Sequence, residues 1–150
     1  MTDFLTPAER SERMSRIKGK DTRPEVTLRK ALHRLGMRYR LHGSGLPGKP
    51  DIVFPRHKAI VFVHGCFWHR HPGCSIATTP KSNTDFWLNK FQNNVARDIK
   101  VEQELELLGW RVFVVWECNL SSSTKTKSTA EHIAKLIKNP NENTPSTQSR

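Results

Sequence analysis

Hydrophobic residues recur at helical spacing in the segment that begins near residue 22. The motif Thr22-Arg23-Pro24-Glu25 has the spacing of a capping box, in which the first residue caps the helix and the fourth lies in its first turn. The apolar positions that follow are Val26, Leu28, Ala31, Leu32 and Leu35. Gly36 then provides a suitable stop. The pattern predicts a helix with Glu25 in its first turn.

The middle of the chain and residues 111–116 carry apolar runs that predict β-strands. A short strand is expected at 38–42, and the Gly/Pro-rich segment 43–50 should be a loop that leads into residues 51–54. Residues 59–63 are apolar throughout and mostly β-branched, which is typical of a strand buried on both faces. Because so few residues separate this strand from the preceding one, the two should form a hairpin.

Helical spacing returns after the strands. From Thr84 a long helix is expected, with one possible break and with Gly109 as its stop; its apolar positions are Leu88, Phe91, Val95, Ile99, Leu105 and Leu108. A last helix is expected at 129–137. Residues 139–150 contain no large apolar side chain and should form a disordered tail. These elements predict an α/β fold, a single domain over residues 1–138.

The N-terminal segment carries a second capping box, Thr6-Pro7-Ala8-Glu9, which predicts a helix over residues 6–18. This helix is strongly basic. Its cationic side chains are Arg10, Arg13, Arg16 and Lys18.

The charge of the whole chain points in the same direction. Lysine and arginine number 25 against 14 acidic residues, so the net charge is +11, which favours a polyanion such as nucleic acid as the partner. Apolar runs are far shorter than the ~20 residues of a membrane-spanning helix, so no membrane association is expected. The N-terminus lacks the pattern of a signal peptide, and we expect the chain to stay in a reducing cytoplasm. Its three cysteines are then thiols or metal ligands.

The cysteines and histidines have the spacing of a metal site. Cys66-x₄-His71-x₂-Cys74 is a compact ligand set, and Cys118 ends a separate predicted strand. Three thiolates and one imidazole suit a closed, structural zinc site. His69 would also have acceptable spacing, and the spacing alone does not choose between the two histidines. The alternative is that no metal binds, with Cys66 and Cys118 as small buried apolar side chains and Cys74 as an incidental thiol.

A carboxylate and two histidines form a second candidate site. Asp51 stands at the entry to one strand, and His64 follows the end of the next. Carboxylate oxygens suit Mg²⁺, and an imidazole such as that of His64 or His69 can accept a proton from an attacking water. This arrangement would suit phosphodiester hydrolysis. An aspartate after proline is also a common turn residue, and each histidine could instead be solvated or bound to zinc.

Paired aromatic residues accompany this chemistry. Phe67-Trp68 lies inside the cysteine loop, and Phe86-Trp87 opens the long helix beside basic and polar residues. Aromatic side chains that do not all face one core can insert between DNA base steps. Packing in the core is the alternative for each of them.

Several of these motifs occur together in one known family. The segments are LPGKPDIVF at 46–54, FVHGCFWHRHPGC at 62–74, Phe86-Trp87, NVARD at 94–98 and GWRVFVVWEC at 109–118. The chain resembles the very short patch repair (Vsr) endonucleases over about residues 11–120. The resemblance implies a restriction-endonuclease-like fold, in which a central mixed sheet is flanked by helices. It also implies a nick on the 5′ side of the thymine in a T·G mismatch, the product of 5-methylcytosine deamination.

The resemblance further implies roles for individual residues. Asp51 would bind Mg²⁺ together with the main-chain carbonyl of Val63, and His69 would be the general base. His64 and Asp98 would support the reaction near the scissile phosphate, with Glu25 as a weaker contributor. The zinc ligands would be Cys66, His71, Cys74 and Cys118. The residues that enter the DNA would be Phe67, Trp68 and Trp87 from one side and Met14 from the other.

One feature departs from a generic nuclease of this fold. The usual second carboxylate and lysine are missing, because the strand after Asp51 reads Val61-Phe62-Val63. By its chemistry alone the site should bind metal weakly without DNA phosphate.

We expect a monomer that acts on double-stranded DNA in the bacterial cytoplasm, at the nucleoid, with other mismatch-repair proteins as further partners. The alternatives are a zinc-stabilised nucleic-acid-binding module without catalysis, and a nuclease of the same fold with a different DNA substrate.

Overall fold

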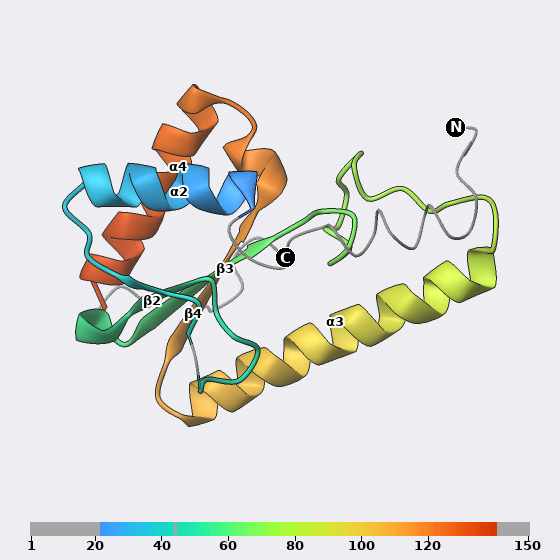
Figure 1. The fold of residues 1–150 in the computed structure, drawn as a ribbon, viewed down its shortest axis with the longest axis horizontal. Coiled ribbons are helices and arrows are strands. Elements are labelled where there is room, and N and C mark those ends of the chain that lie inside the picture. Colours follow the sequence, from blue (N-terminus) through green and yellow to red (C-terminus); the bar gives the residue numbers. More distant parts are fainter. Residues whose placement is uncertain (1–21, 44, 141–150) are drawn as a thin grey trace.

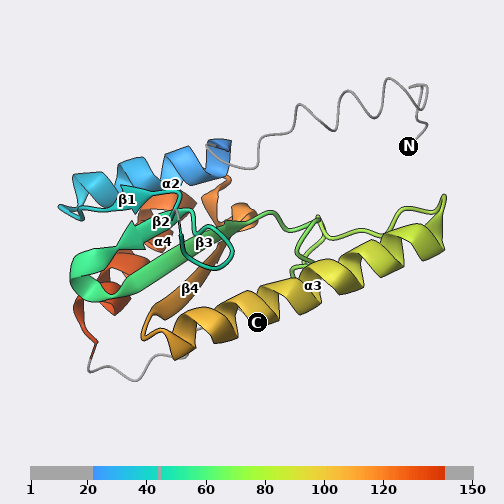
Figure 2. The ribbon, with the colours of Figure 1, turned by 60° about the horizontal axis from the view of Figure 1, so that its bottom comes forward.

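The computed structural model describes residues 22–43 and 45–140. Its sheet has the strand order β1-β2-β3-β4 (Figures 1 and 2), formed by β1 (Arg40–Leu41), β2 (Ile52–Phe54), β3 (Ala59–His64) and β4 (Arg111–Trp116). The pairs β1–β2 and β2–β3 are antiparallel, whereas β3 and β4 are parallel. The predicted hairpin and the mixed sheet are therefore confirmed. A short 3₁₀ turn, η1 (Pro55–His57), connects the two strands of the hairpin.

Helices cover both faces of the sheet. The helices α2 (Arg23–Arg34) and α4 (Ser123–Lys138) lie on one face, and α3 (Thr84–Leu107) lies on the other (Figures 1 and 2). Side chains alternate along a strand, so Val61 packs toward α2 and α4 while Ile60 and Phe62 pack toward α3. The central strand β3 is buried on both faces for this reason, as its unbroken apolar sequence predicts.

The ends of α2 match the sequence prediction. The hydroxyl of Thr22 accepts the N–H of Glu25 at 3.4 Å, so Thr22 is the N-cap. Beyond the other end, Gly36 has φ +85°, a left-handed conformation in which glycine carries no side-chain penalty. Because of this start, the Glu25 side chain lies in the first turn of the helix, and it is buried.

The apolar face predicted for α3 is partly wrong. Phe91 and Leu105 are buried, but Leu88, Ile99 and Leu108 are exposed. The acidic side chains of Asp98 and Glu102 lie on the buried face instead. The helix is also continuous, without the break that its pattern suggested. Its N-terminal half runs beyond the sheet toward the loop that precedes it (Figure 2), so helical periodicity there does not follow a packed core.

The last helix begins earlier than predicted. After β4 and the 3₁₀ turn η2 (Glu117–Leu120), α4 starts at Ser123 rather than at Thr129. The reason is a polar cap: the Ser122 hydroxyl accepts the N–H of Lys125 at 3.1 Å. At the other end, the Arg111 guanidinium donates to the carbonyls of Leu136 and Ile137.

The predicted basic helix at 6–18 and residues 141–150 of the tail predicted at 139–150 lie outside the described residues. Within residues 22–43 and 45–140, no helix is both long and apolar enough to cross a membrane.

Candidate functional site

Asp51 and Val63 meet because β2 and β3 are antiparallel. Asp51 directly precedes β2, and Ile52 is paired with Val61 near the far end of β3. The Asp51 Oδ2 atom accepts the backbone N–H of Val63 at 2.7 Å. This hydrogen bond fixes the carboxylate at the strand end and brings together the two residues that were predicted to share a metal ion.

Asp51 has an unusual electrostatic environment. Burial raises the pKa of its carboxyl from 3.8 to about 6; the Val63 N–H opposes this shift, and the neighbouring charge of Glu25 adds to it. A carboxylate held this way is destabilised by desolvation and by its acidic neighbour, so a bound cation would relieve both effects.

Glu25 reaches the same region from the first turn of α2. Its Oε1 atom lies 3.6 Å from an Arg29 nitrogen and 3.7 Å from His42 Nδ1. His42 also donates its backbone N–H to the carbonyl of Asp51 at 3.1 Å. His42 is not among the predicted site residues, because a lone histidine next to a short strand gives only a weak signal in the sequence.

His69 forms a hydrogen-bonded pair with Asp98. The distance from His69 Nδ1 to Asp98 Oδ2 is 2.7 Å, and Asp98 is presented by the buried face of α3. The ring of His64 stacks on that of His69, with centroids 3.9 Å apart and planes 6° from parallel. With its Nδ1–H donated to the carboxylate, His69 keeps Nε2 as the proton acceptor. The structure therefore brings Asp98 of α3 together with His64 and His69, which come from a different segment of the sequence.

These side chains line one pocket of about 590 Å³ between the end of the sheet and α3. The residues that bear on the chemistry are Asp51, His64, His69, Asp98, Lys49 and Arg97. The last two were not predicted. A slightly larger pocket of about 640 Å³ lies between α2 and α4, and none of its lining residues is acidic, histidine or cysteine. Only the first pocket has the groups that hydrolysis needs.

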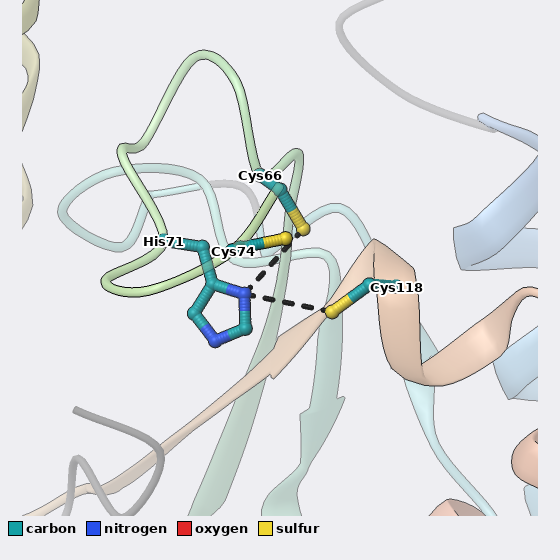
Figure 3. Close-up of side chains that lie close together, drawn as sticks. All are labelled: Cys66, His71, Cys74 and Cys118. Atoms are coloured by element: carbon teal, nitrogen blue, oxygen red, sulfur yellow. Dashed lines mark hydrogen bonds between the residues drawn. The ribbon is translucent and has the colours of Figure 1, made fainter. Parts of the chain in front are cut away.

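The four predicted zinc ligands point toward one another (Figure 3). One atom from each of Cys66, His71, Cys74 and Cys118 lies within 4.8 Å of the others. His71 Nδ1 is 3.7 Å from the Cys66 sulfur and 3.5 Å from the Cys118 sulfur. A tetrahedral zinc ion with ordinary bond lengths has sulfur-to-nitrogen edges of about 3.5–3.6 Å. The donor set and its spacing thus fit zinc, and they favour His71 over His69 as the ligand.

The protonation tendencies of the ligands are also informative. Burial raises the pKa of the Cys66 thiol to about 12 and raises that of Cys118, while burial lowers the pKa of His71. The neutral imidazole that a metal ligand requires is therefore favoured at His71, and a cation would favour ionisation of the buried thiols.

His64, His69 and Asp98 also lie within 4.8 Å of one another. Their shortest separation, 2.7 Å, is a hydrogen-bond length and is shorter than the distance of about 3.4 Å between two ligands of a tetrahedral metal. We therefore interpret this group as a proton-transfer pair with a stacked neighbour.

Trp116 lies between the two clusters. It is fully buried at the end of β4; the His71 ring stacks on it at 4.3 Å, and the His64 ring meets it edge-on at 5.3 Å. Glu117, the next residue, accepts the N–H of Cys66 at 2.9 Å. The same strand end therefore supports both the metal cluster and the histidines.

The predicted wedge residues form an aromatic cluster at the N-terminal half of α3. Phe67 meets Trp68, Trp87 and Phe91 edge-to-face, with ring centroids 5.1 to 5.8 Å apart. Phe67, Trp68 and Trp87 remain partly exposed, so they are neither fully in the core nor free of packing.

Two polar residues fix the backbone around this cluster. The Asn94 side chain donates to the Trp68 carbonyl at 3.1 Å. Arg70 lies over the Phe91 ring at 3.9 Å and donates to the carbonyls of Phe67, Ala77 and Thr78. Arg70 was missed, because an arginine between two histidines gives no sequence signal for such contacts. The other predicted DNA contacts, namely Met14, Arg10, Arg13, Arg16 and Lys18, lie outside the described residues.

Comparison with known proteins places this geometry in context. The family model for DNA mismatch endonuclease Vsr matches residues 2–75. The type II nicking enzyme V.XorIIP of Xanthomonas oryzae is 52% identical over 81% of this chain and 88% of its own length. The type II nicking enzyme V.NmeAIP of Neisseria meningitidis is 47% identical over 92% of this chain and 98% of its own length. The DNA mismatch endonuclease Vsr of Escherichia coli is 41% identical over 83% of this chain and 80% of its own length.

The class that follows is a DNA-cleaving hydrolase. Similarity at this level extends over most of the chain. The chain belongs to the Vsr family of DNA mismatch endonucleases.

Proposed function

We propose that this endonuclease nicks double-stranded DNA on the 5′ side of the thymine in T·G mismatches that arise from deaminated 5-methylcytosine. The observation that carries the proposal is the content of one loop. Residues 66–74 hold three of the four zinc ligands, the aromatic pair Phe67-Trp68 and the hydrogen-bonded histidine His69. Because the aromatic pair and His69 lie on the same loop, residues that would distort the base stack are held next to the residue that would act in cleavage of the DNA backbone. The E. coli relative is itself a DNA mismatch endonuclease.

The catalytic metal in this proposal is Mg²⁺. Asp51 and the Val63 carbonyl would hold it at the strand end, within the restriction-endonuclease-like fold that the mixed sheet supports. When bound, Mg²⁺ would supply positive charge against the phosphate and lower the pKa of a bound water. Zn²⁺ at the cysteine cluster would be structural, because its four protein ligands leave no open position.

His69 is the general base in this mechanism. Its Nε2 atom accepts the proton of the attacking water, while Asp98 holds the ring in the correct tautomer and stabilises the imidazolium that forms. His64 supports the ring of His69 by stacking on it. Glu25 acts on Asp51 through its charge.

The pairing of His69 with Asp98 makes a testable prediction. His69→Ala should lower the single-turnover nicking rate by ~10²–10⁴-fold, and Asp98→Asn by ~10²-fold or more, because the ring loses its oriented tautomer. The double variant should be no slower than His69→Ala alone, since the two residues act as one unit. Rates for all four proteins at saturating duplex decide the matter. Multiplicative losses would show that Asp98 acts independently of the base.

Mismatch recognition would rest on deformation. Unstacking a base step costs a few kcal/mol, and a T·G pair pairs and stacks less well than a matched pair. The free-energy cost of opening the stack is therefore lower beside the mismatch. Phe67, Trp68 and Trp87 would enter there, and Met14 would enter from the opposite groove. Their partial exposure leaves surface for a base step to contact. Arg10, Arg13, Arg16 and Lys18 would bind phosphates and add affinity without sequence preference.

Trp68→Ala should therefore lower the ratio of T·G to matched-duplex affinity, because the unstacked step loses its aromatic partner. Arg13→Ala is the contrasting variant: it should weaken both duplexes equally and flatten the dependence on salt. Titrations of each protein with both duplexes at several salt concentrations measure these effects. If Trp68→Ala leaves the ratio of T·G to matched-duplex affinity unchanged, Trp68 serves only in packing and does not contact the mismatch.

The experiment that tests the proposed function is a substrate panel. The zinc-loaded protein with Mg²⁺ should nick a T·G duplex much faster than matched or branched DNA, and it should act as a monomer. Binding without any cleavage would favour a nucleic-acid-binding module. Preferred cleavage of matched or branched DNA would indicate a nuclease of the same fold with another substrate. We further propose that the enzyme acts in the bacterial cytoplasm, at the nucleoid, and that other mismatch-repair proteins assist it.

A further inference from the structure

The loop that leads into Asp51 has an unusual backbone. Gly48 and Lys49 are consecutive residues with φ +72° and +48°, and the Lys49 N–H donates to the Leu46 carbonyl at 3.2 Å. A side chain on Gly48 would meet Val101 of α3 at 2.4 Å, so glycine lets the loop lie directly against that helix. Left-handed conformations are uncommon outside glycine, and those kept in a structure concentrate at functional sites.

This loop geometry places Lys49 on the wall of the catalytic pocket. Lys49 lines the pocket together with Asp51, and Arg97 lines it from α3, beside Asp98. These two residues are the only lysine and arginine of the lining, whereas three of the lining residues are carboxylic acids. Both cations are exposed, and within the described part of the chain neither forms an ion pair with a carboxylate.

A phosphodiester in this pocket needs cations. Asp51, Asp98 and Glu102 would repel its negative charge, and strand β3, with the sequence Ala59–His64, contributes no lysine or arginine. A point-charge ammonium and a forked guanidinium are the side chains that bind phosphate oxygens best. Lys49 and Arg97 are the members of the lining that can do so.

We propose that Lys49 and Arg97 form a phosphate clamp, in which each side chain binds one phosphate of the DNA strand. Lys49 binds the scissile phosphate, and Arg97 binds the adjacent phosphate on the side of the aromatic cluster. The inference rests on the proposed function, since it assumes that the pocket receives a DNA strand. Lys49 is assigned to the scissile group because it precedes Asp51 by two residues. Arg97 is assigned to the neighbour because its Nη2 lies 3.5 Å from Asn94 Oδ1, and the Asn94 amide holds the carbonyl of Trp68.

The test compares Lys49→Gln, Lys49→Arg and Arg97→Gln with Lys127→Gln, a matched control on α4 in the other pocket. Lys49→Gln should slow single-turnover nicking at saturating duplex by ~10²-fold, because one preorganised charge at the phosphate is lost. Lys49→Arg should restore most of that rate. Arg97→Gln should weaken binding of a matched duplex without Mg²⁺ and reduce its logarithmic salt slope by about 0.9, the value for one phosphate contact. Lys127→Gln should match the parent in both measurements.

The two proposals fail in different ways. If the parent nicks matched DNA as fast as T·G DNA, the proposed function fails, yet the rate loss of Lys49→Gln on that substrate and the reduced slope of Arg97→Gln still support the clamp. If Lys49→Gln nicks at the parent rate, or Arg97→Gln keeps the parent slope, the corresponding half of the clamp is overturned whatever the substrate. A loss in Lys49→Gln that Lys49→Arg does not restore would also overturn it, because a loop defect would then explain the loss.

Discussion

Replacing Asp51 by asparagine is expected to abolish nicking while leaving binding to a T·G duplex close to that of the parent. The amide oxygen can still accept the Val63 N–H, so the strand end keeps its geometry. The negative charge that would hold the metal is lost, and that charge serves the transition state more than the bound duplex. Single-turnover rates and affinities measured on one duplex provide the test. Nicking at the parent rate would remove Asp51 from the catalytic site.

The same substitution should stabilise the protein in the absence of Mg²⁺. The pKa of Asp51 rises from 3.8 to about 6 on folding, so the ionised carboxyl opposes folding above pH 6. Asparagine removes this penalty, which is about 1–3 kcal/mol for a shift of this size. The gain should be full at pH 8 and should fade as the pH falls from 6 toward 4, where the aspartic acid is protonated. Urea unfolding of zinc-loaded proteins measures it; a variant less stable than the parent at pH 8 would contradict this account.

The second large effect is expected for Cys118→Ser. Cys118 is the one ligand outside the 66–74 loop, so it connects the end of β4 to the segment that carries His69 and Trp68. Structural zinc is worth ~10–16 kcal/mol in small zinc peptides, although a chain with a hydrophobic core depends on it less. The variant should hold far less than one zinc per chain, melt at a markedly lower temperature and lose nicking.

Asn119→Ser provides the matched control for this variant. Residue 119 is the exposed neighbour of Cys118 and contributes no ligand, so its zinc content and melting temperature should equal those of the parent. Elemental analysis and thermal melts of the three proteins decide the outcome. A parent without zinc, or Cys118→Ser with undiminished zinc, would mean that the cluster is a set of buried thiols.

The fold could be predicted where local chemistry and packing agree. The Thr22 cap, the apolar run of β3 and the run of β4 all lie where the sequence places them, because each residue there has one favourable environment. The burial along α3 could not be predicted in the same way. Leu88 and Ile99 have the spacing of a core face, but Leu88 lies in the half of the helix that extends past the sheet. Next to Ile99 the buried side is occupied by Asp98, which is hydrogen-bonded to His69.

The candidate site was predictable in its ligands and less so in its surroundings. Cysteine and histidine spacing predicts the candidate metal cluster apart from the choice between His69 and His71, since few other arrangements place four such donors in two segments. His42, Lys49 and Arg97 gave no comparable signal. Each is an ordinary polar residue in the sequence. Each is brought to the site only by the pairing of β1 with β2 or by the loop that packs on α3.

The most direct test of the whole account is to map the nick on end-labelled duplexes that contain one T·G pair within randomised flanks. The zinc-loaded protein with Mg²⁺ should cut only the strand that carries the thymine, on the 5′ side of that base, and Asp51→Asn should leave the strand intact. Cleavage of both strands, a cut that is independent of the mismatch, or equal cutting by Asp51→Asn would contradict the account.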